Sequence, residues 1–204
     1  MAGIGFELKR LFHKKGVLNT TKAYGYATVI CAGPMLLGVI LLLGIMALCT
    51  IFNTLTADRE LLICMITYTL LASVTVTSFF SIVVTRYVAD MLFEEENQAI
   101  LPCFWGSTVI MMAVGSVLYG IFLLFSGATL IQGILCFVLF GELIIVWNAM
   151  SFLSAIKDYK GIFNSFLTSV AVSILLGALL LWLKFPVVES LLFAVSVGYG
   201  IMLV

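Results

Sequence analysis

Charged side chains are scarce in this sequence. Only 10% of its 204 residues are Asp, Glu, Lys or Arg, and 63% are hydrophobic, whereas soluble proteins are about 25% charged. A chain of this composition cannot fold as a single water-soluble domain, so we predict a membrane protein. Its ten positive and ten negative charges cancel, which argues against a nucleic-acid partner.

Residues that perform catalysis or bind metals are also few. His13 is the only histidine, and the sequence has no nucleophile elbow, phosphate-binding loop or Cys-x-x-Cys spacing. The five cysteines fall inside or at the rim of apolar runs: Cys31, Cys49, Cys64, Cys103 and Cys136. We interpret them as small buried hydrophobic residues. We expect no enzyme activity, no metal and no cofactor.

The positions of the charges outline the membrane topology. Nineteen of the twenty lie in five short clusters, and Glu142 alone lies within an apolar run. The runs between clusters exceed the ~20 residues that a helix needs to cross a bilayer, and backbone amides in hydrocarbon must be paired within helices. We therefore predict an all-α polytopic membrane bundle with six transmembrane helices, at 24–52, 61–85, 102–125, 130–156, 161–183 and 187–204.

The basic residues predict the orientation of these spans. With the N-terminus in the cytoplasm, eight of the ten Lys and Arg residues lie inside and only Arg59 and Lys184 lie outside. This satisfies the positive-inside rule. The last span reaches Val204 without a flanking charge. We therefore expect the membrane domain, 23–204, to continue beyond this sequence.

We predict that the first 22 residues form a separate cytoplasmic segment. Ile4, Leu8 and Leu11 recur at helical spacing, with basic residues on the opposite face. We predict an amphipathic helix on the inner leaflet. A helix that binds a cytoplasmic partner is the alternative.

Several sequence blocks resemble a known family. They are MAGIGFEL at 1–8, YGY at 24–26, AGP at 32–34, TRYVADMLFEEEN at 85–97 and FLSAIKDY at 152–159. Together they resemble the first half of the PelG family, polytopic proteins of the Pel exopolysaccharide export system.

The resemblance implies a member of the flippase superfamily, in which two six-helix lobes surround a central cavity. The six predicted spans would form one lobe. The protein would lie in the cytoplasmic (inner) membrane of a bacterium, beside partner Pel-system membrane subunits and a cytoplasmic glycosyltransferase. Its substrate would be a hexosamine-rich polysaccharide or its precursor. The sequence leaves open a second function, a membrane scaffold that docks synthesis machinery without transporting.

The second span carries hydroxyl groups at every fourth residue, which places them on one helix face: Thr69, Ser73, Thr77, Ser81 and Thr85. Such a stripe could line a polar substrate pathway or hydrogen-bond to neighbouring helices. In the fifth span Ser165, Ser169, Ser173 and Gly177 have the same spacing but smaller side chains, which favours close helix packing.

Glu142 is predicted to face the bundle interior or water, because a carboxylate in hydrocarbon costs a few kcal/mol. It could serve transport, by coupling to a proton or cation or by meeting a cationic sugar. It could also be structural, bonded to Asn148 or a neighbouring helix. We place both residues on the candidate pathway.

Two further sites follow from local sequence. Gly33 and Pro34 lie within the first span, where proline bends a helix, so they form a candidate hinge or a static kink. The charged residues after the second span, namely Arg86, Asp90, Glu94 and Glu95, form a candidate cytoplasmic docking site.

The orientation gives a direct prediction. In a chain that lacks the five native cysteines, single cysteines replacing Thr56 and Ser126 should react with an impermeant thiol reagent added outside spheroplasts. Cysteines replacing Asn97 and Tyr159 should react only after the membrane is permeabilised. The reverse pattern would overturn the orientation.

Overall fold

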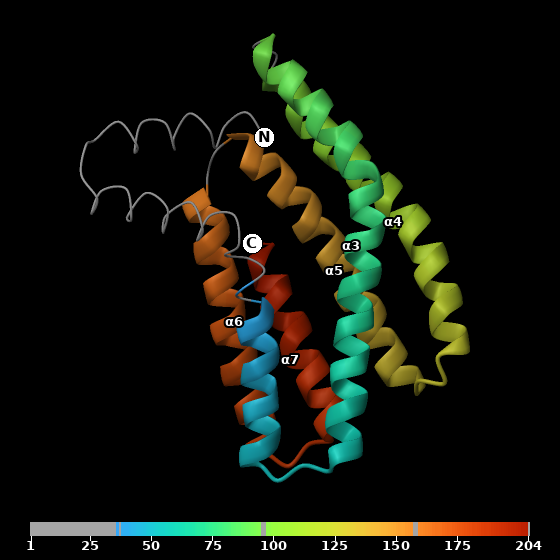
Figure 1. Ribbon diagram of the computed structural model, residues 1–204, viewed down its shortest axis with the longest axis vertical. Helices are drawn as coiled ribbons and strands as arrows, with labels where there is room; N and C mark the ends of the chain where they lie inside the picture. Colours follow the sequence, from blue (N-terminus) through green and yellow to red (C-terminus); the bar gives the residue numbers. More distant parts are fainter. Residues whose placement is uncertain (1–35, 37, 95–96, 157–158, 204) are drawn as a thin grey trace, which may run out of the picture.

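The computed structural model describes residue 36 and the ranges 38–94, 97–156 and 159–203 (Figure 1). Within them the regular structure consists of helices: Gly38–Ile51, α3 at Thr56–Phe93, the short η1 at Asn97–Ala99, α4 at Ile100–Phe125, α5 at Leu130–Ile156, α6 at Tyr159–Trp182 and α7 at Val187–Met202. This confirms the predicted all-α class. The segment 1–22, the Gly33-Pro34 bend and Glu95 lie outside the described residues.

Four of the helices are long and apolar enough to cross a membrane: α3, α4, α5 and α6. The helix Gly38–Ile51 and α7 fall into the shorter class of apolar helices, with 10 to 17 residues each. For α7, 16 residues correspond to about 24 Å, somewhat less than the ~30 Å hydrocarbon core. The structure thus shows a multi-pass apolar bundle, and the count of six spans stays a prediction.

The boundaries of α5 agree with the predicted span, but those of α3 do not. We predicted 61–85, and the helix runs for 38 residues, from Thr56 to Phe93. This is about 57 Å, well beyond the thickness of the hydrocarbon core. The predicted span lies within this helix, which begins before the span and continues past the charged residue Arg86. Arg86 and Asp90 are compatible with helix, since they form an (i, i+4) ion pair at 3.2 Å on its surface.

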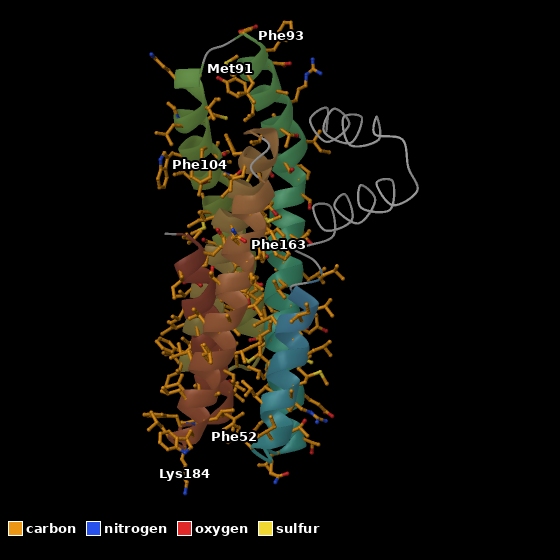
Figure 2. The ribbon with its side chains drawn as sticks, turned by 90° about the vertical axis from the view of Figure 1, so that its left-hand side faces the viewer. Phe52, Met91, Phe93, Phe104, Phe163 and Lys184 are labelled. Carbon is orange, nitrogen blue, oxygen red and sulfur yellow. The ribbon has the colours of Figure 1, made fainter. Side chains whose placement is uncertain are left out.

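The helices form an elongated bundle whose connections gather at its two ends. Figure 2 shows Met91 and Phe93 at one end and Phe52 and Lys184 at the other. Two of the turns contain a left-handed residue other than glycine, Asn53 with φ 47° and Lys184 with φ 60°, each just past the end of a helix. The turns thus alternate between the two ends of the bundle, as expected for a chain that crosses a membrane several times.

The helix α5 lies at the centre of the described core. It packs against α3, α4 and α7 and makes little contact with α6. Its side chains Leu139, Phe140, Leu143 and Ile144 are at most 1% exposed. The apolar side chains on the outer faces of α3 and α4 are exposed, as expected for helices that face lipid.

The helices α6 and α7 are joined through small residues, which confirms the packing interpretation of the fifth-span serines. A Cβ atom on Gly198 would lie 2.8 Å from the carbonyl oxygen of Ser169 and still closer to the Ser173 hydroxyl. A Cβ atom on Gly177 would lie 2.9 Å from the Leu191 side chain. Glycine at these two positions therefore permits the close approach of the two helices.

This contact predicts a difference between two glycine substitutions. Gly198→Ala should lower the free energy of unfolding by about 1–3 kcal/mol, because the new methyl group overlaps the backbone of α6. Gly133→Ala is the matched control, since its Cβ would meet nothing within 4 Å, and it should be neutral or slightly stabilising. Thermal denaturation of the two variants in detergent tests this. Equal stability would contradict the close contact between α6 and α7.

Candidate functional site

Polar side chains along α5 join it to three different helices. Glu142 accepts a hydrogen bond from Ser196 on α7, Trp147 donates one to Ser73 on α3, and Asn148 donates to hydroxyl groups on α4. A polar group without water needs a protein partner. The candidate site is therefore the set of polar contacts that surround α5.

The hydroxyl stripe of α3 lies inside the bundle for most of its length. Thr69 and Ser73 are fully buried, and Thr77 is 6% exposed. Ser81 is half-buried and Thr85 is exposed. Of the predicted pathway residues, the structure thus brings the first three into helix contacts.

Thr69 connects α3 with α4. Its Oγ1 lies 2.7 Å from the Met65 carbonyl oxygen and 2.6 Å from the Tyr119 hydroxyl oxygen. A hydroxyl group has one proton, so when Thr69 donates to Met65, Tyr119 is the donor to Thr69. The Tyr119 ring stacks on Phe140 of α5, with ring centroids 4.3 Å apart, and the Cys136 thiol lies beside both hydroxyl groups. Three helices meet at this cluster.

Ser73 connects α3 with α5 one turn further along. Its hydroxyl accepts from Trp147 Nε1 at 3.1 Å and donates to the Leu70 carbonyl oxygen at 2.8 Å. Thr77 donates to the carbonyl oxygen of Ser73 at 2.8 Å. These hydrogen bonds are the ones expected if the hydroxyl stripe serves helix packing.

Asn148 is 2% exposed and anchors α5 to α4. Its Nδ2 lies 2.9 Å from Ser107 Oγ and 2.8 Å from Thr108 Oγ1. Both hydroxyl groups donate to the Phe104 carbonyl oxygen, so they accept from the amide. Among the described residues Asn148 Oδ1 is buried without a partner, which costs about 1–3 kcal/mol.

Glu142 is half-buried near the middle of α5, at the contact with α7. Its Oε2 accepts from Ser196 Oγ at 2.8 Å. A Cβ atom on Gly200 would lie 3.2 Å from Oε1. The predicted structural bond to Asn148 does not form, since Asn148 turns to α4 instead. Among the described side chains the ion pair found is Arg86–Asp90, so Glu142 has no cationic partner there.

The predicted docking residues lie at one end of the bundle. Arg86 and Asp90 expose 80% and 49% of their side chains while forming their ion pair. Glu94 is exposed directly after α3 ends, and Phe93 beside it is 89% exposed. This end of α3 thus combines charged and apolar groups on its surface (Figure 2).

Sequence reasoning missed Tyr119, Trp147 and the pair Gln132–Glu189. Gln132 Nε2 donates to Glu189 Oε1 at 3.0 Å, joining the first turns of α5 and α7. The available signal was the polar atom of each aromatic residue, because a buried Tyr or Trp usually finds a hydrogen-bond partner. We predicted that the cysteines are buried. This prediction is wrong for Cys64, which is exposed, and is confirmed for Cys49 and Cys136.

Long apolar helices and internally paired polar groups define a multi-pass membrane protein. The whole chain, residues 1–204, matches the model of the PelG family, described as "Putative exopolysaccharide Exporter (EPS-E)". The chain therefore belongs to the PelG family of exopolysaccharide exporters, as its sequence blocks indicated. No curated protein and no solved structure matches it.

The bond between Ser73 and Trp147 predicts energetic coupling between two helices. In a double-mutant cycle of Ser73→Ala and Trp147→Phe, the two changes should be coupled by about 0.6 kcal/mol, the average for hydrogen bonds between membrane helices. Thr75→Ala is the control, because Thr75 is exposed and donates only to the Leu71 carbonyl oxygen of its own helix. Its combination with Trp147→Phe should be additive. Coupling of equal size in both cycles would argue against the Ser73–Trp147 bond.

Proposed function

We propose that this chain is one lobe of a flippase-like transporter that moves an exopolysaccharide, or its precursor, across the cytoplasmic membrane. The family match supports an exporter. The observation that carries the assignment to transport is Glu142, a carboxylate in the middle of an apolar helix with no cationic partner among the described residues.

A carboxylate in the middle of an apolar helix is energetically unfavourable, so its presence requires an explanation. Placing an acidic residue at the centre of a membrane helix costs about 2.5–3.5 kcal/mol on insertion scales. One hydrogen bond from Ser196 does not require a carboxylate, because a glutamine oxygen would accept it equally well. The negative charge itself therefore serves the function that we propose.

The substrate class follows from that charge together with the family. A hexosamine-rich polymer with free amino groups carries positive charge, and a carboxylate on the route would attract it. The route would run along the half-buried side of α5 at Glu142. Thr69, Ser73 and Asn148 hold the neighbouring helices in place in the state that the structure shows, because their polar atoms bond to α4 and α5.

The exposed end of α3 supports a second task for the same protein. Arg86, Asp90 and Glu94 are accessible there, and the predicted orientation places this end in the cytoplasm. We propose that it docks the cytoplasmic glycosyltransferase, beside the other Pel-system membrane subunits. A scaffold that only docks would need this end of α3 but would not need Glu142.

Glu142→Gln separates the transporter from the scaffold. The change keeps the size of the side chain and its acceptor for Ser196 but removes the charge. Polymer export by cells should fall at least tenfold, while the abundance of the protein and its assembly with partner subunits stay unchanged. Secreted polymer is measured by lectin binding and assembly by co-purification.

The matched control is Glu60→Gln, because Glu60 is an exposed carboxylate near the start of α3. Its export should equal that of the unmodified protein. Full export by Glu142→Gln at normal abundance would leave only the scaffold function for this lobe.

A further inference from the structure

Among the described residues, the helices that pack on α5 supply no ion-pair partner for Glu142. The helix α4 contains no charged residue. The charges of α3 lie in its first turns and near its end, at Arg86 and Asp90. The only charged residue of α7 is Glu189, about two turns from Ser196, and it is bonded to Gln132. On α6 the only charged residue is Lys160, in the first turn.

The tyrosine and cysteine side chains on these helices have no cationic form, so they cannot carry a positive charge. They include Tyr119 on α4, Tyr199 on α7 and Cys136 on α5 itself. Tyr119 bonds to Thr69, and the Tyr199 ring packs edge-on against Phe166 of α6. None of them supplies a positive charge to balance a carboxylate.

The two oxygen atoms of Glu142 have different surroundings. Ser196 donates its proton to Oε2 at 2.8 Å. Oε1 faces Gly200, where the missing side chain leaves room, since a Cβ atom there would lie 3.2 Å away. Oε2 is thus occupied by a donor in either ionisation state, and Oε1 is the oxygen that is free to carry a proton.

We propose that Oε1 of Glu142 is a proton-binding site within the contact between α5 and α7. Burying a charged carboxylate in an apolar contact without a cationic partner costs a large free energy. Binding a proton removes the charge and avoids this cost. Uptake forms one O–H bond with a proton from water, and release returns that proton to water. The Ser196 hydroxyl donates to Oε2 both before and after Oε1 binds the proton. The neutral acid therefore keeps the hydrogen bond between α5 and α7.

The proton gives this contact two states. With the proton bound, the contact between α5 and α7 is neutral and can remain closed. When the proton leaves, the negative charge favours water or a cationic group at Oε1. That this second state serves cargo movement rests on the proposed function, but proton binding itself does not.

Infrared spectroscopy of the full-length protein in lipid nanodiscs tests proton binding directly. The carbonyl stretch of a protonated carboxylic acid should appear and disappear as pH is varied in sodium-free buffer. Other Asp and Glu residues also become protonated as pH falls, so the Glu142 band is the part of this signal that is absent from Glu142→Gln. Ser196→Ala should shift the midpoint of this band, because it removes the hydrogen bond to Oε2.

Ser190→Ala is the matched control, since Ser190 is also buried on α7 but donates to the Pro186 carbonyl oxygen. Its midpoint should equal that of the unmodified protein. If Glu142→Gln does not fold, the contrast between Ser196→Ala and Ser190→Ala still tests the site.

Two results would overturn the proton site. One is the absence of any carboxylic-acid band that depends on Glu142 or Ser196 at all pH values tested. The other is loss of the band on adding sodium at constant pH, which would identify a metal cation as the ligand. Failure of the proposed function looks different, because Glu142→Gln would then export normally while the band still titrated in the unmodified protein.

Discussion

The structure depends on one constraint, that polar groups inside the membrane must be paired within the protein. The central helix α5 meets it by bonding to three neighbours through Glu142, Trp147 and Asn148. Because lipid supplies no hydrophobic drive between helices, these bonds and close apolar packing decide which helices associate. The positions of α3, α4 and α7 around α5 follow from them.

Much of the fold could be predicted because the same constraint acts on the sequence. Charge-free apolar runs must be helices. The limits of α5 could therefore be predicted from the loop residues before Leu130 and the charged cluster after Ile156. The end of α3 could not be predicted from the charges in this way. A charge is expected where hydrocarbon ends, whereas a helix ends only where its backbone loses its bonds, and α3 continues past Arg86 to Phe93.

The candidate site was less predictable than the fold. A four-residue period fixes which face Thr69 and Ser73 share, but the same period fits a face toward water and a face toward another helix. The choice depends on Tyr119 and Trp147, which lie 50 and 74 residues away in sequence from their partners. Glu142 was recognisable from sequence because a charge in an apolar run is rare, although its partner Ser196 was not.

The hydrogen bonds also divide the described bundle into two groups. Polar bonds join α3, α4 and α5, while small residues join α6 and α7. Among the side-chain hydrogen bonds found between described residues, two link one group to the other, Gln132–Glu189 and Ser196–Glu142. Each has a glutamate as acceptor. Separation of the two groups along this contact would break both bonds, and charge on a glutamate is the property that a proton or a cationic cargo can change. The contact between the two groups therefore contains two glutamates, and the proton or cationic cargo that we propose would act there.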